Sequence, residues 1–165
     1  MRIFTIVGSS VVETTALPTR PVPGGYVWIA CARHEFEVQQ AQLQSTLQQL
    51  CGHQLVDLHI SDLLNKQLPS HYDYTSQYDL LVFRRLAAGQ TEAGADAPAV
   101  PPGQPMKRGG PPILRRINTN PVGFAVFDQV LLTVHPADCA VRDSYAEKLL
   151  AATSTELRAL SLIHI

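Results

Sequence analysis

Apolar and polar residues alternate at the start of the chain, from Arg2 to Val7, with a period of two that is typical of β-strands. Arg2 to Val7 is rich in β-branched residues and predicts one strand, with Val11 to Thr14 pairing against it across a short turn. Residues 15–25 contain three prolines and predict a loop. Tyr26 to Ala32 is a continuous apolar run, so we expect a central strand with Trp28 as a core anchor.

Two helical patterns follow, with apolar residues recurring at the period of an α-helix. The clearer one runs from Glu35 to Leu50 and places its large apolar side chains on one stripe, at Phe36, Leu43, Leu47 and Leu50. Gly52 is a suitable stop for this helix because glycine adopts the left-handed conformation without strain. Leu55 to Lys66 predicts a second helix, which must end before Pro69 because the residue preceding a proline avoids helical angles.

The second half of the chain returns to strand patterns. Tyr78 to Leu86 is strongly apolar and predicts a strand, and Ile113 to Thr119 predicts another. Between them, residues 87–112 contain six prolines and five glycines and almost no large apolar side chains, so we expect a mobile loop there. Val122 to Phe127 and Val130 to His135 predict a hairpin.

The last clear pattern is a helix from Cys139 to Ala152, with Asp138 as its candidate N-cap. The complete order is strands, two helices, strands and a helix. This order predicts an α/β (α+β) fold, a mixed β-sheet flanked by helices, formed by one domain over residues 1–152.

Composition narrows the possible partners. Only 16% of the residues are charged, against about 25% in typical soluble domains. Partners or further copies of the chain would then cover part of the surface, although a low-charge monomer fits the composition equally well. The formal net charge is −1, and because no basic face is evident we expect no nucleic acid as a partner.

The cysteines and the hydropathy exclude several other classes. Cys31, Cys51 and Cys139 are far apart, so we expect buried free thiols rather than disulfides or a zinc site. A membrane-spanning helix needs about 20 mostly apolar residues. The best candidate, Val122 to Val134, has 13 and is interrupted by Asp128-Gln129, so we expect a soluble chain.

We expect no enzymatic activity. The glycine-rich nucleotide-binding motifs and the G-x-S-x-G nucleophile motif are absent from the sequence. His34-Glu35 lacks the H-E-x-x-H spacing of metalloproteases. His71, Asp73 and Asp79 surround a tyrosine-rich turn, but acid–base catalysis would also need a pocket, which the sequence does not establish.

An ordered set of short segments carries a family resemblance. Its members are an apolar strand with a tryptophan, a helix with a D-x-L-N-like ending, a proline, an aromatic-rich strand and two further strands. In this chain they are Trp28-Ile29-Ala30, Asp62-Leu63-Leu64-Asn65, Pro69, Tyr78 to Leu86, Pro121-Val122-Gly123-Phe124 and Leu131 to His135. This set, from about Tyr26 to Leu150, resembles the N-terminal cytoplasmic domain of the CorA family of divalent-cation (Mg²⁺) transport proteins.

The resemblance implies a regulatory domain of an ion channel on the cytoplasmic side of the bacterial inner membrane. Such proteins continue into a long stalk helix and two transmembrane helices with a Gly-Met-Asn motif, all absent here, so the membrane would be reached only through missing C-terminal helices. Residues 153–165 are interpreted as the start of a truncated stalk helix or as a non-native tail. The implied partners are divalent cations, Mg²⁺ and alternatively Zn²⁺ or Co²⁺, and four further copies in a homo-pentamer.

The resemblance also implies a metal site. Divalent ions between neighbouring domains hold the closed state of such channels, and Asp62 matches the position of one carboxylate ligand. Mg²⁺ takes oxygen ligands and keeps several of its waters. His59 lies three residues before Asp62 on the same helical face, where an imidazole would suit Zn²⁺.

Other interpretations of the same residues stay open. Asp62 would otherwise be an exposed helix carboxylate near Asn65, and His59 a surface histidine without a ligand role. For the whole protein, the alternatives are a zinc-transporting relative of the same fold, or a stand-alone soluble binding or scaffold domain without the pore.

Overall fold

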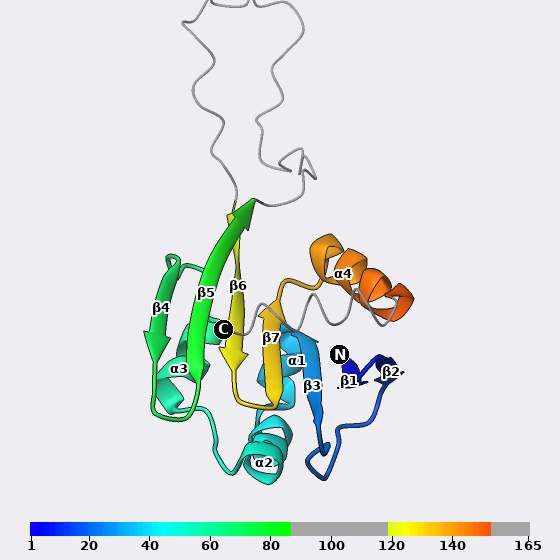
Figure 1. The fold of residues 1–165 in the computed structure, drawn as a ribbon. Coiled ribbons are helices and arrows are strands. Elements are labelled where there is room, and N and C mark those ends of the chain that lie inside the picture. The colour runs from blue at the N-terminus through cyan, green and yellow to red at the C-terminus, as the bar shows by residue number, and fades with distance from the viewer. Residues whose placement is uncertain (87–118, 153–165) are drawn as a thin grey trace, which may run out of the picture.

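A computed structural model describes residues 1–86 and 119–152 of the chain. The expected loop at 87–112, the expected strand residues 113–118 and the expected stalk or tail at 153–165 lie outside the described residues. Within the described part, seven strands form one mixed sheet with helices on both faces, which confirms the predicted fold class (Figure 1).

The sheet has the strand order β2-β1-β3-β7-β6-β5-β4. Among the described strands, β3 and β7 are the parallel pair at the centre, with Ile29 opposite Leu132, and every other pairing is antiparallel. The strands are β1 Arg2–Val7, β2 Ser10–Thr14, β3 Gly25–Ala32, β4 His71–Tyr74, β5 Asp79–Leu86, β6 Thr119–Val126 and β7 Val130–His135.

The helices divide between the two faces of the sheet. Helices α1 (Arg33–Val38), α2 (Gln40–Cys51) and α3 (Asp57–Leu64) lie behind the sheet in Figure 1, and α4 (Ala140–Ala151) lies in front of it. The longest described helices, α2 and α4, have 12 residues each, and in the described part of the chain no helix is long and apolar enough to span a membrane.

Each face of the sheet has its own hydrophobic cluster. The larger cluster packs Ile29, Leu80 and Leu132 of the sheet against α1, α2 and α3, and it includes the predicted stripe Phe36, Leu43, Leu47 and Leu50. The smaller cluster joins Phe4, Trp28 and Ala30 to Ala146 and Leu149 of α4. The indole of Trp28 stacks on Phe4 with ring centroids 4.7 Å apart and donates its N–H to Thr133 Oγ1 at 3.0 Å, as expected of a core anchor.

The helix predicted from Glu35 to Leu50 is two helices. The chain leaves helical angles at Gln39 (φ −102°, ψ 15°), between α1 and α2, although the stripe of buried side chains continues across the break. Helix α1 begins where Glu35 Oε2 accepts the backbone N–H of Ala32 at 2.7 Å. Helix α2 ends at Gly52 with φ of +75°, the left-handed stop that the sequence predicted.

Two further details differ from the sequence prediction. The tyrosine-rich turn contains a short edge strand, β4, paired with β5 through His71 opposite Val82. The N-cap of α4 is Cys139 rather than Asp138, and no side chain caps this helix; the carbonyl of Asp138 instead accepts an N–H of Arg85 at 2.9 Å.

Helix α3 packs against β6 of the sheet, and two features set its position. A Cβ atom at Gly123 of β6 would overlap Cδ2 of Leu63, so glycine allows the close approach. The guanidinium of Arg33 donates to the carbonyls of Leu63 at 3.3 Å and Pro121 at 2.7 Å, which ties the end of α3 to β6. Through this packing, the polar side chains of α3 meet the edge strand β4.

Candidate functional site

Helix α3 and strand β4 face each other through two histidine–aspartate pairs. His59 and Asp62 lie about one turn apart on α3, and His71 and Asp73 lie two residues apart on β4, so each couple shares one face of its element. His59 pairs with Asp73, and His71 lies opposite Asp62. Each element therefore supplies one base and one acid to the contact, which we call the α3–β4 ladder.

His59 lies in the interior, and the expectation of a surface histidine was wrong. His59 is 2% exposed. Its Nδ1 lies 2.7 Å from Tyr78 Oη, and its Nε2 lies 3.1 Å from Asp73 Oδ2. A carboxylate only accepts hydrogen bonds, so in the neutral ring Nε2 carries the proton and Nδ1 accepts from the tyrosine. The tyrosine oxygen also accepts the backbone N–H of Val56 at 3.0 Å.

Asp73 reaches the solvent, with half of its side chain exposed. Its pKa is lowered, first by the hydrogen bond from His59, then by the backbone N–H of Tyr74, and further by the nearby charge of His71. Burial raises the pKa of the Tyr78 phenol, which therefore stays protonated and available as a donor. The first pair of the ladder is thus a satisfied hydrogen-bond chain from Val56 to Asp73.

The side chain of Asp62 is only 18% exposed. The alternative interpretation of Asp62 as an exposed helix carboxylate is therefore wrong. Oδ2 of Asp62 lies 3.6 Å from Nε2 of His71, whose side chain is 29% exposed. That separation is longer than a hydrogen bond. The expected role of Asp62 in metal binding stays a prediction.

The D-x-L-N ending has a local structural role as well. Asn65 closes α3, and its side-chain oxygen accepts the backbone N–H of Gln67 at 2.9 Å. This turn places Pro69 and His71 beside α3, because the chain reverses immediately after the helix.

A complete metal site is not present within the residues described. In the ranges 1–86 and 119–152, no three His, Cys, Asp or Glu side chains converge so that they could hold a metal ion. The ladder offers two candidate ligands at one point, Asp62 and His71, because both ring nitrogens of His59 already have partners. Water or another chain would have to supply the remaining ligands of an ion bound there.

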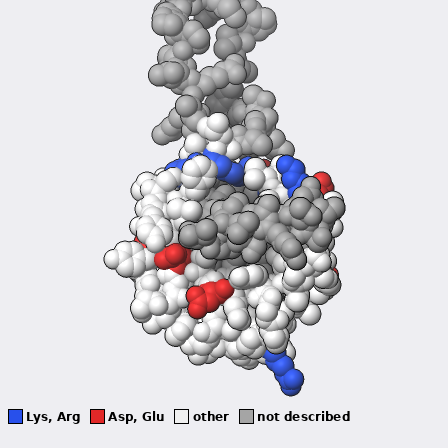
Figure 2. Space-filling view, viewed as in Figure 1, with Lys and Arg blue, Asp and Glu red and all other residues white. Residues whose placement is uncertain are grey.

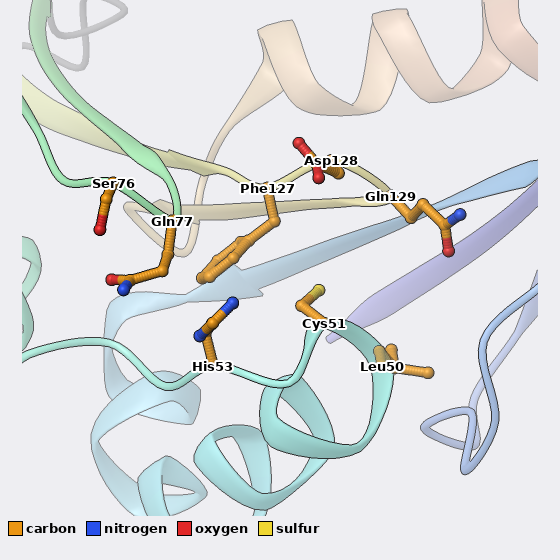
Figure 3. Close-up of a pocket in the computed structure, with 8 residues that line it drawn as sticks. All are labelled: Leu50, Cys51, His53, Ser76, Gln77, Phe127, Asp128 and Gln129. Atoms are coloured by element: carbon orange, nitrogen blue, oxygen red, sulfur yellow. The ribbon is translucent and has the colours of Figure 1, made fainter.

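A cavity of about 240 Å³ lies beside the ladder, where Phe127 of the β6–β7 turn packs on Tyr78 with ring centroids 4.7 Å apart and extends towards His53 after α2 (Figure 3). Cys51 and Asp128 also line it. Burial, followed by the charge of Asp128, raises the pKa of the Cys51 thiol to about 11, so this sulfur is a poor nucleophile and a poor metal ligand at neutral pH.

The prediction of buried free thiols is confirmed for Cys31 and Cys139, whereas Cys51 is free but only partly buried. Burial raises the pKa of Cys31 to about 12.

Comparison with known proteins gives one kind of match. No family model and no curated protein matches the chain. Among solved structures, the full-length CmaX protein is 12% identical with a TM-score of 0.56, covering 95% of this chain and 42% of that one. The ZntB cytoplasmic domain from Vibrio parahaemolyticus RIMD 2210633 is 10% identical with a TM-score of 0.57, covering 93% of this chain and 50% of that one.

The soluble domain of CorA from Methanocaldococcus jannaschii is also similar, with 10% identity and a TM-score of 0.54, covering 92% of this chain and 47% of that one. The chain spans half or less of the length of each of these three proteins. Identities this low establish the fold alone. That fold is the one shared by the soluble domain of CorA and the cytoplasmic domain of ZntB.

Proposed function

We propose that this chain is the cytoplasmic regulatory domain of a CorA-like divalent metal ion transporter. The observation that carries the proposal is the fold shared with CorA and ZntB domains. The position of Asp62 supports it, because this carboxylate lies at the end of α3, partly exposed and without a hydrogen bond from His71 at their 3.6 Å separation. In the proposal, five copies form a ring on the cytoplasmic side of the bacterial inner membrane.

The proposed mechanism is ion-linked gating. A hydrated Mg²⁺ supplies positive charge between carboxylates of neighbouring domains and needs only one or two protein oxygens. Asp62 would provide one oxygen, and a carboxylate of the adjacent protomer the other. Without the ion, the carboxylates repel each other and the ring loosens. Because coupling is reciprocal, whatever strengthens closure of the ring also strengthens ion binding by the same factor.

A zinc-transporting relative of the same fold is the second candidate. One observation favours it: the imidazole of His71 lies beside Asp62, and imidazole nitrogen is a ligand for Zn²⁺ rather than for Mg²⁺. The identity of a transported ion is set by the pore of such a protein, so flux measurements on the full-length protein decide between the two.

The test compares two aspartates of α3 in the full-length protein. Asp62→Ala should raise the Mg²⁺ concentration that halves ion flux, because one ligand of the closing ion is removed. Asp57→Ala is the matched control: Asp57 is exposed in the first turn of the same helix and should leave the curve unchanged. Coinciding curves for wild type and Asp62→Ala would contradict the proposed gating role, and an absence of any flux would favour a stand-alone binding domain.

A further inference from the structure

The contact between α4 and the sheet depends on few buried side chains. Of the 12 residues of α4, Ala146 and Leu149 are buried, whereas α2, which has the same length, buries four. Both side chains of α4 pack in the smaller cluster with Phe4 and Trp28. Because an element with few buried apolar contacts opens more readily, α4 can separate from the sheet at a lower free-energy cost than α2.

The side chain of His135 lies where β7 ends and the connection to α4 begins. The residue is 1% exposed, and its Nδ1 lies 2.8 Å from the carbonyl oxygen of Pro136. A carbonyl oxygen only accepts, so Nδ1 carries the proton of the neutral ring and Nε2 presents a lone pair. That lone pair faces Nη1 of Arg142, in the first turn of α4, at 3.5 Å. The neutral ring therefore accepts a weak hydrogen bond from the helix.

Asp143 fixes the guanidinium of Arg142 in this position. Its carboxylate accepts from Nε and Nη2 of Arg142, each at 2.8 Å, and from Nη1 of Arg2 at 3.2 Å. Since Arg2 belongs to β1, the same carboxylate also ties α4 to the sheet. The two-point contact leaves Nη1 of Arg142 directed at His135.

Protonation of His135 reverses the sign of this contact. A proton on Nε2 would place an N–H against the N–H groups of Arg142, so a hydrogen bond would be lost and two cations would face each other. Burial lowers the pKa of His135, and the charge of Arg142 lowers it further. The carbonyl of Pro136 and the carboxylates of Glu35 and Asp143 oppose this effect without cancelling it.

The two nearby carboxylates are already occupied. Glu35 of α1 pairs with the amino group of Met1 and accepts the backbone N–H of Ala32 at 2.7 Å. Asp143 is held by arginines from α4 and β1. While α4 is docked, a protonated His135 ring is therefore buried without an acid of its own, and release of the helix would give it water instead.

We propose that His135 and Arg142 form an acid-sensitive latch, in which protonation of His135 releases α4 from the sheet while the rest of the domain stays folded. The latch is independent of the proposed ion site, because α3 and β4 take no part in it. Docking is fully favoured above about pH 6.5, the ordinary pKa of histidine, because the docked ring binds a proton less readily than the released one. Below that pH the docking equilibrium should fall by up to about tenfold per pH unit, as expected for one proton.

Trp28 provides a direct test, because it is the single tryptophan of the chain and its ring centroid lies 5.5 Å from that of Tyr145 on α4. In the full chain, acrylamide quenching of its fluorescence should increase as the pH falls from about 7 to 5, since the departing helix exposes the indole. Methyl NMR signals should show Leu149 changing over the same range while Leu80 of the larger cluster stays native. Quenching that does not change with pH, or simultaneous loss of both methyl signals, would overturn the proposal.

Three variants separate the latch from a general effect of acid. His135→Gln should abolish the pH dependence of quenching, because the amide stays neutral and can still donate to the carbonyl of Pro136. Arg142→Gln should reduce it, because no charge then faces the ring. Lys148→Gln is the control: it removes the same charge from an exposed position in the last turn of α4 and should respond as wild type. A wild-type response in either His135→Gln or Arg142→Gln would contradict the latch.

Discussion

The two faces of the sheet are formed by the same apolar strands, but helices cover the two faces to very different extents. On β5, Leu80 and Val82 point to the face of α1, α2 and α3 and are 0% and 1% exposed. Leu81 and Phe83 alternate with them on the other face and are 42% and 55% exposed. Strand alternation therefore fixes which residues share a face, whereas only the arrangement of helices decides whether that face is buried.

Helix α4 accounts for the difference. It packs on β1 and β3 through Phe4 and Trp28, and leaves β4 and β5 uncovered by described helices (Figure 1). In Figure 2 most of the visible Lys and Arg side chains gather across the upper part of the described surface, and a further one lies at its lower edge. On the uncovered strands, Tyr72 stacks on Tyr74 and donates a hydrogen bond to Asp79 Oδ1 at 3.1 Å.

Adjacent leucines on β5 give the largest expected contrast between the two faces. Leu80→Ala should lower the free energy of unfolding by about 2–5 kcal/mol, because it leaves a cavity in the larger cluster. Leu81→Ala should cost less than about 1 kcal/mol, since the side chain is already partly in water. Urea denaturation of both variants measures the two values, and equal losses would contradict the proposed difference between the faces.

The close approach of α3 predicts the next effect. Gly123→Ala should destabilise the protein by about 1–3 kcal/mol, because the added methyl group overlaps Leu63. The double variant Gly123→Ala/Leu63→Val should recover part of that loss by freeing space. Denaturant unfolding measures both, and a single variant as stable as wild type would show that α3 moves away at no cost.

A smaller effect concerns the buried end of β7. Burial lowers the pKa of His135, and the nearby charge of Arg142 lowers it further. The unfolded state therefore binds a proton more readily, so stability is full above about pH 6.5 and falls as pH decreases below that value. His135→Gln should reduce the slope of unfolding free energy between about pH 6.5 and 5. The control variant His34→Ala should leave this slope unchanged. A slope that His135→Gln also leaves unchanged would show that His135 does not cause the pH dependence.

The smallest expected effect is on the uncovered face itself. Phe83→Thr should change the free energy of unfolding by under about 1 kcal/mol, because threonine retains strand preference and little buried area is lost. It should also reduce self-association of the chain, as measured by sedimentation velocity, because an exposed aromatic is removed. Strong destabilisation would mean that this face is covered in solution.

Local sequence patterns were sufficient to predict most strands. They failed where contacts between distant residues determine the secondary structure. The hairpin of β6 and β7 and the central strand β3 were predicted because their apolar residues are consecutive and their turns are marked. Strand β4 was missed because its alternation, in His71-Tyr72-Asp73-Tyr74, mixes polar and aromatic residues, and its polar side chains contact α3 while its tyrosines are exposed. The break at Gln39 was missed because the apolar stripe runs through it.

The candidate site was predicted only in part. Asp62 followed from a family resemblance and His59 from its spacing to Asp62 on one helical face, but the burial of His59 depends on Tyr78, which is 19 residues away along the chain. The H-x-D spacing of His71 and Asp73 was the available signal for the ladder. It becomes informative only once β4 is recognised as a strand, because alternate residues of a strand share a face.

The most direct test of the account is whether a divalent cation stabilises the folded chain through Asp62. Thermal unfolding of wild type, Asp62→Asn and Asp57→Asn would be followed over increasing Zn²⁺ and, separately, Mg²⁺. A ligand that binds only the folded state adds about 2.7 kcal/mol at one hundred times its dissociation constant. The account predicts a concentration-dependent rise of the unfolding midpoint in wild type and Asp57→Asn, and its loss in Asp62→Asn. An equal rise in Asp62→Asn, or no rise in wild type with either ion, would contradict it.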